Sequence, residues 1–180
     1  VLGIPPGAFA VFWAGRMDPV KRLEFVLGAA TELRDRGSWF GLFGDGPQRQ
    51  ALEATARALA LRNVNFLGWR SDWARYLSAA DAFAFPSHTE GMPNGALEAM
   101  AAGLSVVGSD RPVLRELRGD DNRMLMMEND SPDGLAKALD LLRLDPAQAA
   151  AIGARAAQWV RAECTPDAAV EQTLAAYQAI

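Results

Sequence analysis

Residues 82–107, AFAFPSHTEGMPNGALEAMAAGLSVV, contain the pattern that decides the fold. An apolar run over 82–85 is followed by a polar loop, a helix-forming segment that begins at Asn94, and a second apolar run over 104–107. Strands that are apolar on both faces and joined by a helix are typical of β-α-β units, whose parallel strands are covered by helices. The stretch therefore predicts a parallel sheet.

The same alternation extends in both directions along the chain. We expect buried strands at 8–14, 39–43, 63–67, 82–85, 104–107 and 123–127. Apolar residues at a period near 3.6 predict helices at 19–36, 48–61, 72–80, from Asn94, and at 112–117, 132–144, 146–162 and 166–179. The predicted fold class is α/β, a Rossmann-like six-stranded parallel sheet with helices on both faces.

Composition limits the class of protein. The 180 residues carry a net charge of -4 and one cysteine, Cys164. This charge argues against nucleic acid as a partner, and a lone cysteine suits a reducing compartment, so we expect a cytoplasmic protein. No apolar run reaches the roughly 18 residues that a membrane span needs. We expect a single domain over 1–180, with residues 1–7 as the remnant of a linker.

Ligands of open parallel sheets bind beyond the carboxyl ends of the strands, which makes the loops after the first four strands candidate sites. After the first strand, GRMDPVK at 15–21 places Arg16 and Lys21 five residues apart. Two cations at a strand end suit a diphosphate, because charge-assisted hydrogen bonds are strong. The alternative is a pair of solvated surface charges.

The loop after the second strand, GDGPQRQ at 44–50, contains Gly44, Asp45 and Gly46. Arg49 stands where the dinucleotide fingerprint has its third glycine, so that fingerprint fails. A tight turn with Pro47 at the start of a helix is the favoured interpretation of this loop.

The loop after the third strand reads GWRSDW at 68–73. Gly68 and Trp69 are candidates to line an apolar slot for a nucleobase. Ser71 or Asp72 is expected to cap the helix that follows.

The loop after the fourth strand contains Glu90 and Glu98 with seven residues between them. A helix that begins there offers free N–H groups and a partial positive charge, which favour an anion; the donors are those of Asn94, Gly95, Ala96 and Leu97. Carboxylates accept hydrogen bonds and so suit sugar hydroxyls. We expect the amides, with Arg16 and Lys21, to hold a diphosphate between two sugars. The alternative is that Glu98 complements the helix dipole and Glu90 caps the helix.

His88 is the only histidine and directly precedes this motif. We expect a structural or acceptor-side polar role for it rather than that of a general base. The sequence has no His or Cys cluster and no D-x-D pair for a divalent ion, so neither a metal nor another cofactor is expected.

With these motifs assembled, the chain resembles the C-terminal, donor-binding half of a GT-B glycosyltransferase. The family is the retaining group 1 (family 4), whose members carry two glutamates separated by seven residues. The matching segments follow the family's order over nearly the whole chain: GRMDPVK, LFGDGPQRQALE, VNFLGW, AADAFAFPSHTEGMPNGALEAMAAGLSVVGSD and the terminal helices.

The resemblance implies a role for each candidate residue. Arg16 and Lys21 would contact the donor diphosphate and stabilise its charge as it leaves, and Glu90 would face the donor sugar as the third catalytic residue. Glu98 would accept from the ribose hydroxyls. The backbone of Gly91, Met92, Pro93 and Asn94 would border the sugar, the amides of Ala96 and Leu97 the phosphates, Gly68 and Trp69 the base, with the turn of Gly44, Asp45 and Gly46 nearby.

Two positions depart from the family's usual pattern. Relatives often have Gly-Phe-Gly after the first glutamate, where this chain has Gly91, Met92 and Pro93, which we interpret as a subtype. The residue after Lys21 is often glycine in relatives, and here it is Arg22, which is expected to add charge near the phosphates.

The expected function is metal-independent, retaining transfer of a sugar from a nucleotide sugar, UDP-linked by default. The acceptor, a glycan, lipid or small molecule, would be held largely by a missing N-terminal domain, toward which the helix at 165–179 would pack. The chain alone would then bind the donor weakly without turnover. The full-length enzyme could also lie at the inner face of the membrane. The alternative is a stand-alone nucleotide-binding module; the sugar, base and acceptor stay open.

Overall fold

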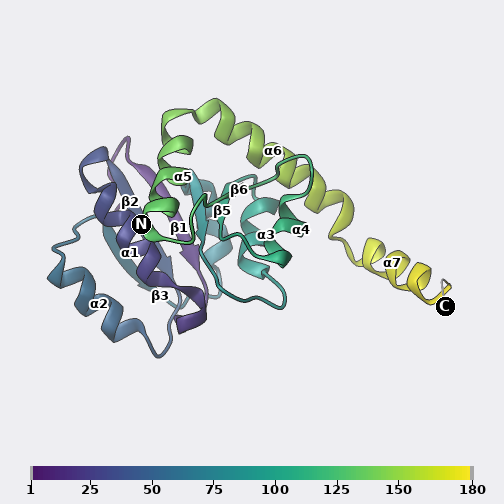
Figure 1. The fold of residues 1–180 in the computed structure, drawn as a ribbon, viewed down its shortest axis with the longest axis horizontal. Helices are drawn as coiled ribbons and strands as arrows, with labels where there is room; N and C mark the ends of the chain where they lie inside the picture. The colour runs from purple at the N-terminus through teal and green to yellow at the C-terminus, as the bar shows by residue number, and fades with distance from the viewer. Residues whose placement is uncertain (1, 179–180) are drawn as a thin grey trace.

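All six strands run parallel, in the order β3-β2-β1-β4-β5-β6, in the computed structural model, which describes residues 2–178 (Figure 1). The strands are β1 (Phe9–Ala14), β2 (Ser38–Phe43), β3 (Val64–Gly68), β4 (Ala82–Phe85), β5 (Ser105–Gly108) and β6 (Leu125–Met126). The strand order reverses between β1 and β4, and such a switch point is where open α/β sheets bind ligands.

Helices connect the strands and continue to the end of the described chain. The α-helices are α1 (Leu23–Glu32), α2 (Arg49–Ala58), α3 (Asn94–Ala101), α4 (Pro112–Arg118), α5 (Pro132–Leu144), α6 (Pro146–Glu163) and α7 (Pro166–Gln178). Three short 3₁₀ helices are η1 (Pro19–Lys21), η2 (Arg34–Arg36) and η3 (Trp73–Ala79). Proline occupies the first turn of α4, α5 and α6, where its missing N–H costs nothing.

The strands separate two apolar cores, because alternate side chains of a strand point to opposite faces. In β1, Val11 and Trp13 face the core formed with α1, α2 and α5. Phe12 faces the other core, formed with η3, α3, α4 and part of α6. Both faces of the sheet are therefore covered, which confirms the predicted fold class and explains the nearly uninterrupted apolar strands.

The predicted helix over 19–36 is divided into three pieces, η1, α1 and η2. The first break falls at Arg22, whose φ of 50° is left-handed and cannot continue a right-handed helix. The second follows α1, and Gly37, also left-handed, ends η2 as predicted.

Smaller differences concern two other predicted elements. The segment predicted as a helix over 72–80 is the 3₁₀ helix η3 (Trp73–Ala79). The prediction that Ser71 or Asp72 caps it was wrong, because η3 begins after Asp72 without a side-chain capping hydrogen bond. The strand predicted at 123–127 contains only the two residues of β6.

The two ends of the described chain differ in how they pack. Leu2 and Ile4, within the predicted linker remnant, pack against the α3-side core. At the other end α7 contacts α6 and extends away from the body of the molecule (Figure 1). The predicted bounds of this helix included residue 179, which lies outside the described residues. None of the helices within 2–178 is long and apolar enough to cross a membrane.

Candidate active site

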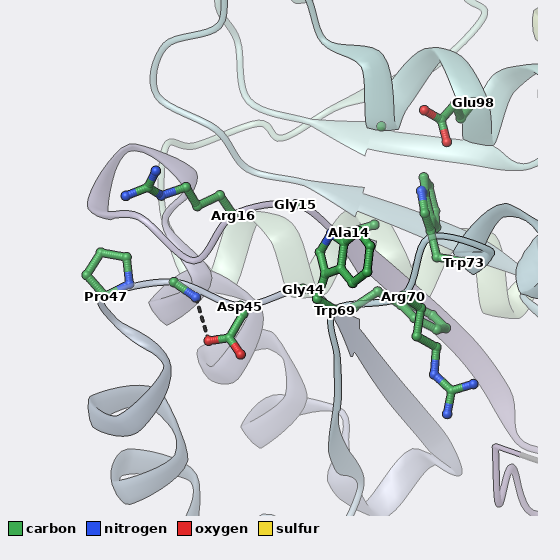
Figure 2. Close-up of a pocket in the computed structure, with 13 residues that line it drawn as sticks. Ala14, Gly15, Arg16, Gly44, Asp45, Pro47, Trp69, Arg70, Trp73 and Glu98 are labelled. Atoms are coloured by element: carbon green, nitrogen blue, oxygen red, sulfur yellow. Dashed lines mark hydrogen bonds between the residues drawn. The ribbon is translucent and has the colours of Figure 1, made fainter.

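A cleft of about 690 Å³ opens at the carboxyl ends of β1, β2 and β3, facing the start of α3. It lies at the switch point between β1 and β4, beyond the carboxyl ends of the strands as predicted. Figure 2 shows most of its lining. The residues that line it are Ala14, Gly15, Arg16, Phe43, Gly44, Asp45, Gly46, Pro47, Trp69, Arg70, Trp73, Gly95 and Glu98. Seven of these are among the predicted site residues.

Glycines allow the loops after β1 and β2 to touch at the floor of the cleft. A Cβ at Gly44, whose φ is 130°, would overlap the carbonyl oxygen of Gly15. The Met17 N–H donates to the Asp45 carbonyl at 2.8 Å, and the Gly44 N–H donates to the Gly68 carbonyl at 2.8 Å. The loops after three neighbouring strands are therefore tied together by their backbones, which agrees with the tight-turn interpretation of Gly44 and Gly46.

The Asp45 carboxylate lies on this wall and is bound locally. It accepts from the Gly46 N–H at 2.8 Å and from Arg49 at 3.0 Å. The Gly46 hydrogen bond and then Arg49 lower the pKa of Asp45 below its usual value, so it is ionised at neutral pH.

Two indoles form the opposite part of the wall. Trp69 is 74% exposed, while Trp73 is half-buried, with its ring 6.2 Å from that of Phe43 and 5.9 Å from that of Phe83. In Figure 2 the Trp73 indole points toward Glu98 across the cleft. Rings with one polar N–H can contact both a nucleobase and a ribose.

Sequence reasoning identified Trp69 and missed Trp73 and Arg70. The signal was present, because Trp73 lies four residues after Trp69 in a segment predicted to be helical. Trp73 ends the same GWRSDW segment and begins η3, which turns its ring toward the cleft. Arg70 is turned aside: its guanidinium contacts the Tyr76 hydroxyl at 2.8 Å and stacks over that ring.

α3 carries Glu98 and Gly95 to the other side of the cleft. Gly95 lies so close to the end of β1 that a Cβ would approach the Ala14 carbonyl oxygen to 3.2 Å. Partial burial of the Glu98 carboxyl in the cleft wall raises its pKa, although the residue as a whole is exposed. Its partly dehydrated carboxylate is suited to accept from hydroxyl groups.

The free donors at the start of α3 are fewer than predicted. The Asn94 N–H donates to the Met92 carbonyl at 2.9 Å, and the Leu97 N–H donates to Pro93 at 3.0 Å. Of the four predicted amides, this leaves Gly95 and Ala96 without a backbone acceptor within the described chain. The backbone N–H groups free to meet a phosphate are therefore those of Gly95 and Ala96, and not those of Asn94 and Leu97 as predicted.

Arg16 lines the cleft, but its side chain is directed outward. Its Nε pairs with Asp18 at 2.9 Å, its side chain is 73% exposed, and Figure 2 shows it pointing away from Glu98. An exposed pair of this kind is weak, so the guanidinium can turn toward the cleft at little cost.

Lys21 lies beside the cleft. Its side chain contacts Glu90 and does not contact Arg16. Its ammonium donates to both carboxylate oxygens of Glu90, at 2.7 and 2.8 Å. A backbone hydrogen bond of 2.8 Å from His88 to Val20 joins the two loops. The structure thus brings together the predicted cation and the first predicted glutamate, 69 residues apart in sequence.

The residues after Glu90 form an exposed turn. Gly91, Met92 and Asn94 are exposed and Pro93 is buried before α3, so this turn forms a rim next to Lys21 and Glu90 rather than part of the cleft wall. Gly91 has open space where a Cβ would be.

Arg22 does not add charge near the phosphates as expected. Its Nε donates to the Pro86 carbonyl at 2.8 Å, its Nη2 pairs with Asp130 at 2.6 Å, and its guanidinium stacks over Phe25 at 4.5 Å. The backbone explains why glycine suits this position, because Arg22 is left-handed.

No group of three or more His, Cys, Asp or Glu residues within 2–178 is arranged to hold a metal ion. The charges available at the cleft in the described chain are those of the side chains named above.

Residues 8–145 match the family of glycosyl transferases group 1. The chain is 34% identical to the lipopolysaccharide core biosynthesis glycosyltransferase LpsD of Rhizobium meliloti, covering 81% of this chain and 42% of LpsD. It is 32% identical to a D-inositol 3-phosphate glycosyltransferase of Kineococcus radiotolerans, covering 87% of this chain and 41% of that protein.

Solved structures show the same fold. Anabaena HepE in complex with UDP and glucose superposes with a TM-score of 0.86 at 21% identity, over 96% of this chain and 49% of HepE. The chain therefore spans about two fifths of the curated relatives and half of HepE. With a parallel sheet of GT-B type and a family match over most of its length, the chain belongs to the glycosyl transferases group 1.

Proposed function

We propose that this chain is the donor-binding domain of a retaining glycosyltransferase and binds a nucleotide diphosphate sugar. The observation that carries the proposal is the cleft at the switch point, in which two indoles face Glu98 and Gly95 of α3. This arrangement supplies rings for a base, a carboxylate for ribose hydroxyls and backbone N–H groups for phosphate.

The charges around the cleft suit the leaving group of such a transfer. As the bond between sugar and phosphate breaks, negative charge develops on the diphosphate and must be stabilised. Arg16, Lys21 and the start of α3 supply positive charge there, so no metal is needed in this proposal. Glu90, beside Lys21, faces the sugar, and the backbone of residues 91–94 borders it.

Because the chain spans less than half of LpsD, the acceptor and its surroundings belong in this proposal to an N-terminal domain outside it. α7 supports this division. Its exposed side chains Val170, Leu174 and Tyr177 follow each other at helical spacing, and among the described elements α7 packs mainly on α6, with little contact there. Deletion of residues 166–180 should leave the melting temperature of this chain almost unchanged, whereas it should destabilise a protein that contains both domains.

Calorimetric titration of the 180-residue chain tests the donor proposal. We expect weak binding of one of UDP, GDP or ADP, with UDP the first choice, and tighter binding of the corresponding nucleotide sugar. HepE, whose fold this chain shares, was solved with UDP and glucose, which makes UDP the sensible starting probe. Equal affinities for diphosphate and nucleotide sugar, unaffected by Glu90→Gln, would favour a stand-alone nucleotide-binding module instead.

Turnover gives a second test. The isolated chain should transfer no sugar, because it lacks the acceptor side, and transfer should appear when an N-terminal domain is joined to it. An isolated chain with normal transferase rates would contradict the two-domain arrangement. LpsD is named for lipopolysaccharide core biosynthesis, and this supports our proposal that the full enzyme is cytoplasmic and acts at the inner face of a membrane.

A further inference from the structure

The ion pair between Lys21 and Glu90 links the two halves of the proposed donor site. The ammonium of Lys21 uses two of its three N–H groups on the carboxylate, at 2.7 and 2.8 Å. The Glu90 side chain is only 7% exposed and that of Lys21 22%. The cation needed for the diphosphate and the carboxylate needed for the sugar therefore satisfy each other.

Three hydrogen bonds hold this pair in register. The Lys21 backbone N–H donates to the carbonyl of Asp18, the residue before η1, and the His88 N–H donates to the Val20 carbonyl at 2.8 Å. Arg22 reaches the Pro86 carbonyl at 2.8 Å. The backbones that carry Lys21 and Glu90 are thus fixed relative to each other, and a change of partner requires only a rotation of the Lys21 side chain.

We propose that the donor diphosphate and Glu90 compete for Lys21, so that Glu90 becomes free for the sugar when a phosphate takes the ammonium. This inference rests on the proposed function of the site. Removing the cation from a nearly buried carboxylate is costly unless other donors replace it. The hydroxyls of the sugar are such donors, whereas a nucleoside diphosphate has none to offer there.

The exchange has a consequence for selectivity. A bound diphosphate without a sugar leaves Glu90 unpaired, while the intact nucleotide sugar satisfies both groups. The site should then prefer the donor to the diphosphate that remains after transfer, which assists release of that product. Lys21 and Glu90 act here as a coupled specificity pair rather than as two independent contacts.

The experiment is a double-mutant cycle on nucleoside diphosphate affinity, measured by calorimetry with whichever of UDP, GDP or ADP binds the wild-type chain. Glu90→Gln should bind that diphosphate about three- to tenfold more tightly, because Lys21 no longer has to leave a charged partner. In a Lys21→Met background the same Glu90→Gln change should have no such effect.

Two controls separate exchange from other causes. Asp130→Asn removes an equal charge from the carboxylate that pairs with Arg22, the residue after Lys21, and it should not reproduce the gain. Melting curves without nucleotide show whether each variant folds, and the pairing predicts that Lys21→Met is destabilised and that adding Glu90→Gln restores stability.

Each outcome of the cycle either supports or overturns the proposed exchange of Lys21 between Glu90 and the diphosphate. A tighter complex in Glu90→Gln that disappears with Lys21→Met supports the exchange. An unchanged or weaker complex overturns it, as does a gain that persists without Lys21 or is matched by Asp130→Asn, since either indicates simple charge repulsion. If none of the three diphosphates binds the wild-type chain, the proposed function itself fails, which is a distinct outcome from failure of the cycle.

Discussion

The two sides of the switch point are held by different kinds of interaction. On the side of β1, β2 and β3, backbone hydrogen bonds and close glycine contacts join the loops. On the side of β4, the pair of Lys21 and Glu90 lies between loops that are distant in sequence. The first wall is rigid because its geometry is set by backbone, whereas the second can exchange partners by rotating one side chain. A rigid wall is suited to bind a base and a phosphate in one position. A wall that can exchange partners is suited to release the product after transfer.

The strongest way to break this comparison is to disturb the rigid wall at Gly44. Gly44→Ala places a Cβ on the Gly15 carbonyl oxygen at a φ of 130°. We expect a loss of about 2–4 kcal/mol in the free energy of unfolding, from overlap and backbone strain together. Urea denaturation of both proteins measures this difference.

Gly91→Ala is the matched control for that substitution. Gly91 lies on the adjustable side and has open space at its Cβ position. It should change stability by less than about 0.5 kcal/mol, as exposed substitutions usually do. Equal losses in the two variants would show that the two walls do not differ in rigidity.

Arg16→Ala tests whether a side chain on the rigid side also serves the diphosphate. If Arg16 turns inward to a phosphate, its loss should weaken nucleotide binding about ten- to a hundredfold, the worth of a charge-assisted hydrogen bond. The thermal shift caused by nucleotide should disappear, while stability without nucleotide should stay almost the same because the Asp18 pair is exposed.

Arg34→Ala serves as the comparison variant, since Arg34 also has an exposed partner, Asp35 at 3.5 Å, outside the cleft. It should leave nucleotide binding intact. A normal thermal shift in Arg16→Ala would remove Arg16 from the site and leave Lys21 as its main cation.

The smallest expected effect concerns Glu98, which stands between the two walls. Burial raises the pKa of Glu98 in the folded protein. At pH values between the unfolded and the folded pKa, the folded protein therefore keeps a proton on Glu98 that the unfolded chain has lost. Its contribution to stability is therefore full below the ordinary carboxyl pKa and is lost as pH rises through the raised folded value. Nucleotide affinity should move the other way, because only the carboxylate accepts from both ribose hydroxyls.

Glu98→Gln should flatten both trends. Melting curves and titrations between roughly pH 4 and 7 cover the window above the ordinary carboxyl pKa. Affinity that falls together with stability as pH rises would show that the protonated form binds the nucleotide, contrary to the proposed role.

The strands, the fold class and the cleft could be predicted because each depends on local pattern. Apolar runs gave the strands, and their carboxyl ends placed Gly44, Trp69 and Glu98 around one opening. The features that escaped prediction depend on contacts between distant segments. The left-handed backbone at Arg22 and the partners of Lys21 and Arg22 are determined by how η1 meets the β4 loop, which no local pattern reports.

Strand order also shapes how the chain reaches its native state. β1 lies at the centre of the sheet, yet one of its neighbours is β4, and the Ala10 N–H is bound by Asp81, 71 residues later. Loop closure over such distances slows folding. During synthesis, one edge of β1 therefore stays unpaired until β4 leaves the ribosome.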